Sequence, residues 1–296
     1  MQNYLTKNDL EQIKQKGIDK NMIERQIQQF IEGFDFVNLI AAVKRNNGLY
    51  TFNETDVKEL AREYEKACKG LKILKFVPAS GAASRMFKHL FEFLETYDRS
   101  PDAIKKYTED QSFNSVFNFI NNLEKFPFYE ELSEIIKKEA KDIKDLIQNQ
   151  EYNIIIDKTL NENGLNYSNL PKGLIKFHSY KEGARLAVEE HLVESAHYGK
   201  EKNHNVRIHF TVSPEHMKAF EKTIKEKGAI YEKAFDVKFN IKLSIQKPST
   251  DTIAVDLNNQ AFRNADGSLL FRPGGHGALI ENLNELDADI IFIKIM

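Results

Sequence analysis

The sequence has little cysteine, no excess of either charge and no long apolar run. Its 296 residues include one cysteine, Cys68, which excludes an internal disulfide and a cysteine-based zinc cluster. The 42 basic and 44 acidic residues leave a formal charge of −2, so net charge favours neither nucleic acid nor a membrane surface as partner. Residues 1–7 lack the apolar core of a signal peptide, and no apolar run reaches membrane-spanning length. The sequence therefore predicts a cytoplasmic protein.

The overall composition is that of an ordinary folded protein. Hydrophobic residues make up 41% and charged residues 29%, a balance that argues against disorder. The length allows one large domain or two small ones, with an ample core.

The segment 1–70 is predicted to be a helical N-terminal cap. Thr6 begins a first helix, and Asn53 with Asp56 three residues later forms a capping box for a helix over 54–69. Gly70 ends that helix. The aromatic stretch Phe34-Asp35-Phe36 is attributed to packing.

The segment 71–296 is predicted to be one α/β domain with a helical insertion over 86–168. Strands are expected over 71–77, 174–178, 206–212, 237–245 and 289–296, with a helix over 184–198 and a hairpin over 253–271. Ser213-Pro214-Glu215 is a helix start, and Gly228 is expected to end that helix. Alternation of strands and helices at this spacing favours a mostly parallel sheet.

A turn of small residues joins the first strand to the following helix. Such a turn can cradle phosphate, because small side chains let backbone N–H groups approach an anion and the helix N-terminus adds favourable partial charge. Tight strand–helix packing selects the same residues, so that alternative stays open. The turn contains Ser80, Gly81, Ala82, Ala83, Ser84 and Arg85.

Three other segments fall at predicted strand ends, where ligands bind to open parallel sheets. They are Leu170-Pro171-Lys172-Gly173 with the nearby Arg185, Gln246-Lys247-Pro248, and Pro273-Gly274-Gly275-His276-Gly277. Together with the first turn they offer glycines, cations and a histidine, which suit a nucleotide. Three of these cations also have structural alternatives. Lys172 could be a plain surface lysine, and Arg85 or Arg185 could be one half of an ion pair.

Two other interpretations are weaker. Glu190, His191, Glu194 and His197 lie on one predicted helix, but their spacing lacks the H-E-x-x-H order, so a solvated face is favoured over a metal site. Ser213 lacks a Gly-x-Ser-x-Gly elbow and is interpreted as a helix cap rather than a nucleophile.

Three motifs resemble those of a known enzyme class. Residues 79–86 resemble the G-G-x-G-T-R-[LM] signature of GT-A-type nucleotidyltransferases, and 170–173 resemble the P-K-G that completes it. Residues 272–279, Arg-Pro-Gly-Gly-His-Gly-Ala-Leu, are similar to a segment of UDP-sugar and UDP-N-acetylhexosamine pyrophosphorylases. Over the whole chain the arrangement resembles an uncharacterised bacterial domain-of-unknown-function family related to these enzymes.

The resemblance implies a Rossmann-like GT-A fold and nucleotidyl transfer from a nucleoside triphosphate to a sugar-1-phosphate, with release of pyrophosphate. Arg85 and Lys172 would be catalytic, and Mg²⁺ would bridge the phosphates. Nucleotide-binding positions would be Ser80, Gly81, Ala82, Ala83, Ser84, Arg185, Gln246, Gly274, Gly275, His276 and Gly277.

Two departures from the enzyme pattern matter. Ala83 stands in place of a glycine and Ser84 in place of a threonine, and an alanine there would narrow the approach to phosphate. The aspartate that coordinates Mg²⁺ in the enzymes would lie beyond Met296, so a C-terminal truncation is expected. Two further functions therefore stay open: a non-catalytic nucleotide- or nucleotide-sugar-binding protein, and a helical interaction protein on a vestigial α/β core.

Overall fold

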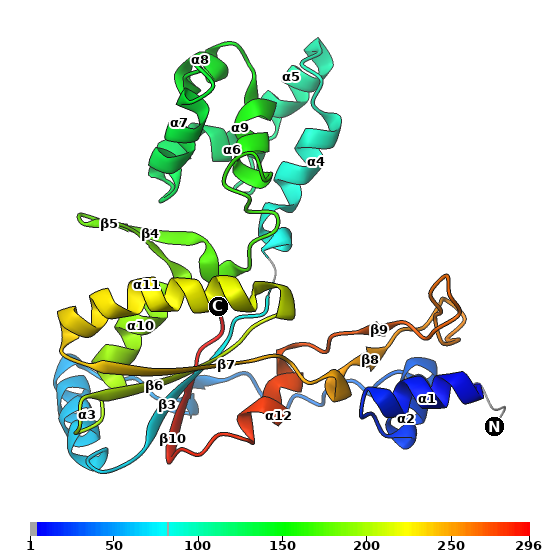
Figure 1. Ribbon diagram of the computed structural model, residues 1–296, viewed down its shortest axis with the longest axis vertical. Coiled ribbons are helices and arrows are strands. Elements are labelled where there is room, and N and C mark those ends of the chain that lie inside the picture. The colour runs from blue at the N-terminus through cyan, green and yellow to red at the C-terminus, as the bar shows by residue number, and fades with distance from the viewer. Residues whose placement is uncertain (1–4, 82) are drawn as a thin grey trace. The chain divides into compact units, whose positions relative to one another are not determined.

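The main sheet has four strands in the order β10-β3-β6-β7, and all run parallel (Figure 1). The computed structural model describes residues 5–81 and 83–296, except for the side chains of Ser84 and Arg85. Five of the six residues of β3 are buried, as expected for a parallel strand covered on both faces. These strands confirm the predicted mostly parallel α/β architecture; their bounds are β3 Ile73–Pro78, β6 Asn205–Thr211, β7 Lys238–Ser244 and β10 Ile290–Ile293.

Three small two-stranded sheets complete the strand inventory of the described residues. They pair β1 Lys44–Arg45 with β2 Gly48–Leu49, β4 Lys176–Tyr180 with β5 Gly183–Leu186, and β8 Thr252–Ile253 with β9 Phe271–Arg272. The expected helix over 184–198 was wrong at its start, because residues 183–186 pair with β4 and the helix begins at Ala187.

The helices follow the predicted pattern closely. The expected capping box at Asn53 is present, since its side chain accepts from the N–H of Asp56, and the predicted helix start at Thr6 also has one, since the Thr6 hydroxyl accepts from the N–H of Asp9. The bounds are α1 Lys7–Gln15, α2 Lys20–Glu32, α3 Glu54–Ala67, α4 Lys88–Thr96, α5 Pro101–Glu109, α6 Val116–Asn121, α7 Tyr129–Lys137, α8 Ile143–Gln148, α9 Tyr152–Leu160, α10 Ala187–Tyr198, α11 Met217–Phe235 and α12 Ile280–Leu283.

One helix end was predicted wrongly. Gly228 lies inside α11, which continues to Phe235 and ends where Asp236 adopts a left-handed conformation with φ of 51°. Phe220, Gly228 and Tyr231 form the buried face of this helix. Packing of that face outweighs the modest cost of a glycine in a helix interior.

The chain divides into two compact units. The first comprises 1–74, 201–203 and 244–291, and its core is an isoleucine-rich cluster that includes Ile13, Ile23 and Ile253. The Arg263 guanidinium donates to both carboxylate oxygens of Asp9, at 2.8 and 2.7 Å, and fixes the 253–271 segment to α1.

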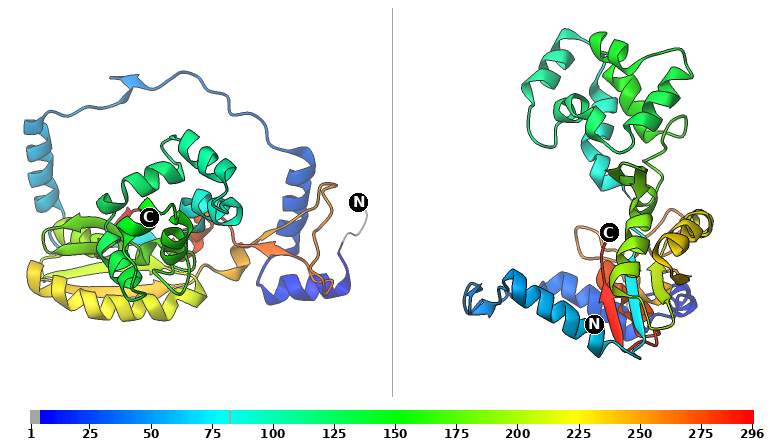
Figure 2. Two further views of the ribbon diagram at one scale, coloured as in Figure 1. Left: turned by 90° about the horizontal axis from the view of Figure 1, so that it is seen from above. Right: turned by 90° about the vertical axis from the view of Figure 1, so that its left-hand side faces the viewer.

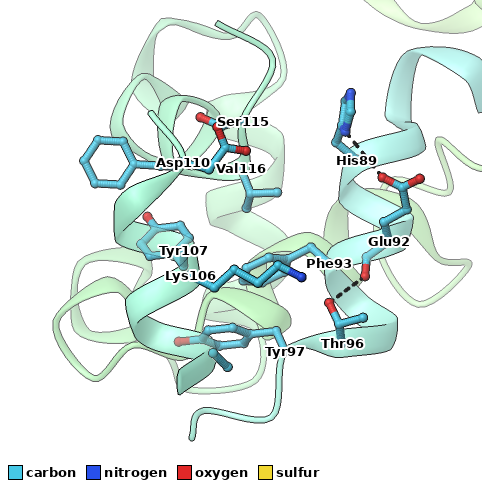
Figure 3. Close-up of a pocket in the computed structure, with 12 residues that line it drawn as sticks. His89, Glu92, Phe93, Thr96, Tyr97, Lys106, Tyr107, Asp110, Ser115 and Val116 are labelled. Atoms are coloured by element: carbon cyan, nitrogen blue, oxygen red, sulfur yellow. Dashed lines mark hydrogen bonds and ion pairs between the residues drawn. The ribbon is translucent and has the colours of Figure 1, made fainter. Parts of the chain in front are cut away.

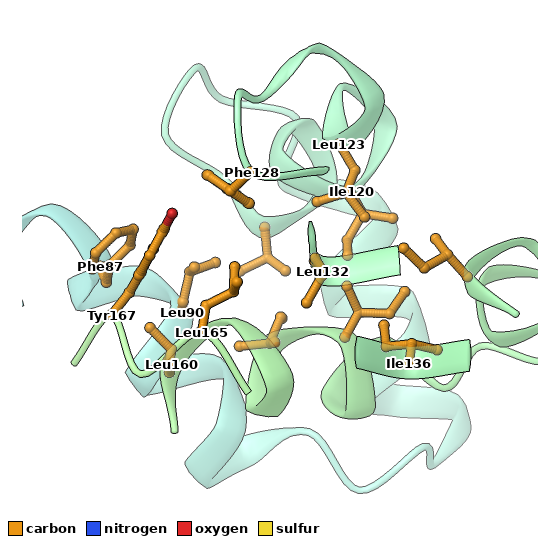
Figure 4. Packing of buried hydrophobic residues seen from close by; sticks show 14 of the residues in the cluster. Phe87, Leu90, Ile120, Leu123, Phe128, Leu132, Ile136, Leu160, Leu165 and Tyr167 are labelled. Atoms are coloured by element: carbon orange, nitrogen blue, oxygen red, sulfur yellow. The ribbon is translucent and has the colours of Figure 1, made fainter. Parts of the chain in front are cut away.

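The second unit comprises 75–200, 204–243 and 292–296. It has two hydrophobic clusters. One lies within the helical insertion, where Leu132, Ile136 and Leu160 are fully buried among helices α4 to α9 (Figure 4). The other, which contains Val77, Leu192 and Phe210, joins β3, α10 and β6.

The aromatic stretch after α2 does not pack as expected. The side chains of Phe34 and Phe36 are 80% and 100% exposed, and Ile40 is 99% exposed. The chain runs without regular structure from Gly33 to Val43, so the helical cap predicted over 1–70 is interrupted there. None of the helices within 5–81 and 83–296 is long and apolar enough to cross a membrane.

Candidate functional site

The small-residue turn follows β3 at the carboxyl end of the sheet. The Ala79 N–H donates to the Thr211 carbonyl oxygen at 2.7 Å, which continues the ladder between β3 and β6 by one bond. Gly81 is then exposed, lacks a positive φ, and would have no described atom within 4 Å of an added Cβ. Neither backbone conformation nor packing among the described residues requires glycine here, and the Gly81 backbone is exposed.

The Lys172 segment lies against this turn. The Lys172 N–H donates to the Gly81 carbonyl oxygen at 3.2 Å, although the whole helical insertion separates the two residues in sequence. The next residue, Gly173, packs closely against α11, since an added Cβ would lie 2.5 Å from Cζ of Phe220. The Lys172 side chain is half-buried and forms no ion pair with the described residues.

The rest of the turn is described only in part. Ala83 has φ of −80° and is fully buried, because it packs in the hydrophobic cluster of the second unit. Its methyl group therefore fits a normal backbone conformation and packs in the core. Ala82, and the side chains of the predicted site residues Ser84 and Arg85, lie outside the described part of the chain.

A serine–histidine pair lies at the carboxyl end of the neighbouring strand β6. The Ser213 hydroxyl is 2.6 Å from Nδ1 of His216, and Nε2 of His216 is 2.8 Å from the Asn169 carbonyl oxygen. A carbonyl oxygen only accepts, so Nε2 carries a proton and donates to it; in a neutral ring the Ser213 hydroxyl then donates to Nδ1. Ser213 thus starts a helix as predicted, but its hydroxyl binds His216 instead of capping a backbone N–H. This histidine ties the loop before Lys172 to the strand.

Arg185 has partners within the chain. Its guanidinium carbon lies 3.9 Å above the ring centre of Tyr180, and its Nη1 is 3.8 Å from a carboxylate oxygen of Glu190. Glu190 also faces His178, whose Nδ1 is 3.3 Å away. Arg185 therefore forms an ion pair and a ring contact between β4, β5 and α10, as its structural interpretation predicted. That Arg185 binds a nucleotide stays a prediction.

The second glycine-rich turn belongs to the first unit. Gly274 is required there, since an added Cβ would lie 2.8 Å from both the Ala278 Cβ and the Thr250 carbonyl oxygen. Gln246 donates to the Thr250 hydroxyl at 3.3 Å, so Gln246 and Gly274 lie near each other. Gly275, His276 and Gly277 are exposed. That the two glycine turns form one site stays a prediction.

A buried charge cluster between β3 and α10 was not predicted from the sequence. Lys75 is 1% exposed, and its ammonium donates to Glu194 at 2.7 Å; Lys294 donates to the other oxygen of the same carboxylate at 2.9 Å. Burial lowers the pKa of Lys75, an effect that Glu194 offsets in part. Burial alone would raise the pKa of Glu194, but the hydrogen bonds from Lys75 and Lys294 lower it to about 2. The signal was a lysine inside an otherwise apolar strand.

His191 belongs to the same cluster. It is buried, and its Nδ1 has no hydrogen-bond partner among the described residues. Burial, followed by the charge of Lys75, lowers its pKa to about 4, so the imidazole is neutral at pH 7. His191 and Glu194, which were expected to lie on a solvated face of α10, are therefore packed and ion-paired, whereas His197 is exposed as expected. No group of three or more His, Cys, Asp or Glu within 5–81 and 83–296 could hold a metal ion.

The helical insertion encloses two cavities. The smaller, about 330 Å³, lies between α4, α5 and α6, with Tyr97, Tyr107 and Phe93 on its walls and the Lys106 side chain extending across it (Figure 3). The larger, about 760 Å³, is bounded by α4, α6 and the start of β4. Both share His89 and Ser115 in their linings.

Fold and site together define a mixed α/β protein with a parallel sheet and an open glycine turn at the carboxyl end of β3. A family model described as "Domain of unknown function (DUF4301)" matches residues 6–296, so the chain belongs to that family. No curated protein matches the sequence. No solved structure matches it either.

Proposed function

We propose that the protein is a nucleotidyltransferase that joins a nucleoside triphosphate to a sugar-1-phosphate and releases pyrophosphate. One observation carries the proposal. The hydrogen bond from Lys172 to Gly81 joins the two segments that resemble the halves of the nucleotidyltransferase signature, at the carboxyl end of a parallel sheet. Ligands bind to open parallel sheets at this edge.

In the proposed reaction an oxygen of the sugar-1-phosphate attacks the α-phosphorus in line. A new phosphorus–oxygen bond forms while the bond to the pyrophosphate oxygen breaks, and pyrophosphate leaves. Such chemistry depends on positioning and on neutralising charge. The exposed Gly81 leaves room for phosphate at the turn, and the Lys172 ammonium, free of ion pairs with the described residues, would offset charge on the departing pyrophosphate.

The departure at Ala83 does not stand against the proposal. Because its φ is −80° and its methyl group is buried, the alanine neither strains the turn nor occupies solvent-facing space. The resemblance also implies Mg²⁺, but the described residues provide no acidic cluster that fits the ion. No step is therefore assigned to a metal.

Release of pyrophosphate tests the proposal. Purified protein is incubated with each nucleoside triphosphate and a panel of sugar-1-phosphates, with Mg²⁺ in the buffer. Lys172→Met should lower turnover about 10²- to 10³-fold, the usual effect of losing one transition-state donor. Lys181→Met, a substitution of an exposed lysine in the turn between β4 and β5, is the matched control and should leave turnover unchanged. Absence of pyrophosphate release with every pair would refute the proposal, and binding without turnover would favour a non-catalytic nucleotide-binding protein.

A second candidate is a protein-binding role, which the exposed segment after α2 favours. A cluster of exposed apolar side chains is typical of an interaction surface. Phe34, Phe36 and Ile40 lie close together along the chain, and each is at least 80% exposed. Light scattering of the wild type and of a Phe36→Asp, Ile40→Asp double variant tests self-association through this segment. Association in the wild type that the double variant loses would support it, and a monomeric wild type would contradict it.

A further inference from the structure

The larger cavity in the second unit borders both halves of the proposed phosphate site. Its lining includes Met86, which follows the glycine turn and whose N–H donates to the Ala83 carbonyl oxygen at 2.8 Å. Its lining also includes Ile175, whose N–H donates to the Lys172 carbonyl oxygen at 3.2 Å. A ligand with phosphates at Gly81 and Lys172 would therefore have this cavity as its neighbour.

Phenylalanine rings dominate the cavity walls. Phe126 lies 5.1 Å from Phe119 and 5.2 Å from Phe128, measured between ring centres, and the planes of Phe126 and Phe128 differ by only 18°. Phe113 and Phe177 also line the cavity and are 93% and 46% exposed. A cavity of about 760 Å³ with aromatic walls falls in the range of small-molecule sites, roughly 300–1,000 Å³.

The loop that carries Phe113 is held in place. The Asn118 amide nitrogen on α6 donates to the carbonyl oxygens of Gln111 and Ser112, at 2.9 and 2.7 Å. The Phe113 ring is nevertheless almost wholly exposed. An exposed ring on a loop whose backbone is already held provides a flat apolar face beside the cavity without the cost of ordering a mobile loop on binding.

The one formally charged side chain in the described lining of the cavity already has a partner. The Lys176 ammonium lies 2.7 Å from a Glu131 carboxylate oxygen. That pair leaves no unbalanced charge on the described wall at this position. An uncharged planar ring suits such a cavity better than a phosphate or a carboxylate does.

We infer that this cavity binds the nucleobase of the nucleotide substrate by stacking against phenylalanine. The inference rests on the proposed function, because the phosphates at Gly81 and Lys172 place the base within reach of the cavity. It assigns the base to the unit that contains both of those residues, whereas the resemblance also placed nucleotide-binding positions in the turn at 274–277. It also gives the helical insertion a role as the wall that selects the base.

The chain contains no tryptophan, so a single introduced tryptophan reports on the cavity alone. Phe177→Trp places the reporter in the cavity wall, and Phe262→Trp is the matched control, since the two phenylalanines are 46% and 47% exposed. Phe113→Trp is a second reporter, whose native ring makes almost no packing contacts to disturb. Each variant is titrated with uridine, cytidine, adenosine and guanosine, and with N-acetylglucosamine as a ligand that has no aromatic ring.

At least one nucleoside should quench the cavity reporters saturably and leave Phe262→Trp unaffected, while the sugar should quench neither. Adding Phe113→Ala to the Phe177→Trp variant should weaken that nucleoside about tenfold, and adding Phe36→Ala, at a fully exposed ring, should not. No saturable quenching by any nucleoside, or equal quenching of the control, would overturn the inference. If nucleoside triphosphates still raise the melting temperature in that case, the proposed function stands without this base site; if they do not, both fail.

Discussion

Two glycine-to-alanine substitutions distinguish a position where packing requires glycine, Gly173, from a position where we propose that glycine leaves room for a ligand, Gly81. In Gly173→Ala the new Cβ would lie 2.5 Å from Cζ of Phe220 and 3.1 Å from Sδ of Met296. Phe220 is fully buried and cannot move aside easily. Overpacking of this kind costs about 1–3 kcal/mol. At roughly 2–4 °C per kcal/mol, the melting temperature should fall by about 2–12 °C.

Gly81→Ala should behave in the opposite way. No described atom lies within 4 Å of the new Cβ, and the residue lacks a positive φ. Restriction of the unfolded chain should then raise stability by about 0.4–1 kcal/mol. The methyl group would, however, occupy the space through which phosphate approaches the turn. Losing one hydrogen bond to a charged group, worth about 1.5–3 kcal/mol, should weaken triphosphate binding at least tenfold.

Differential scanning fluorimetry gives the stability of both variants, and isothermal titration calorimetry gives their affinity for the nucleoside triphosphate that binds the wild type. A fall in melting temperature for Gly81→Ala as large as that for Gly173→Ala would refute the claim that the turn is open. Wild-type affinity in Gly81→Ala would show that phosphate does not approach this glycine.

Three further predictions concern the ion-paired cluster and the serine–histidine pair. Glu194→Gln should lower the free energy of unfolding, measured in urea, by about 3–5 kcal/mol, because it leaves the buried Lys75 ammonium without its counter-charge. Lys75→Met should lower it far less, since Glu194 is partly exposed and keeps its ion pair with Lys294. Equal losses in the two variants would contradict the arrangement. With a folded pKa of about 4 against 6.5 unfolded, His191 binds fewer protons when folded, so stability should fall on the order of 3 kcal/mol as pH drops from 6.5 to 4. His191→Gln should flatten that loss, and an unchanged slope would contradict the assignment. His216→Phe should lower the free energy of unfolding by about 1–2 kcal/mol and speed tryptic cleavage after Lys172, because the hydrogen bonds to Ser213 and to the Asn169 carbonyl oxygen are lost. Cleavage at the wild-type rate would show that the serine–histidine pair does not hold the loop before Lys172.

Much of the fold could be predicted from local signals. The capping boxes at Thr6 and Asn53 fix helix starts through bonds within one turn of chain, so the sequence alone carries the information. The strands over 73–78, 205–211 and 238–244 follow from apolar runs or alternation. Gly228 was misjudged because its effect depends on the packing of the whole α11 face, which a local rule does not contain.

The candidate site was predictable only in part. The turn at Gly81 and the segment at Lys172 were identified by motif, and their contact across the helical insertion needed the structure. Arg185 shows the limit of residue type as evidence, since a cation suited to phosphate here stacks on Tyr180. The phenylalanine cavity could not be foreseen, because core-facing and cavity-facing rings recur at the same helical spacing.

The central claim is that a nucleotide binds where Gly81 meets Lys172. Hydrogen–deuterium exchange of the wild type, with and without each nucleoside triphosphate, tests it most directly. The account predicts slower exchange in peptides covering 79–87 and 169–175 with at least one triphosphate, and none of that protection in Lys172→Met. Protection confined to other segments, or no protection with any triphosphate, would contradict it.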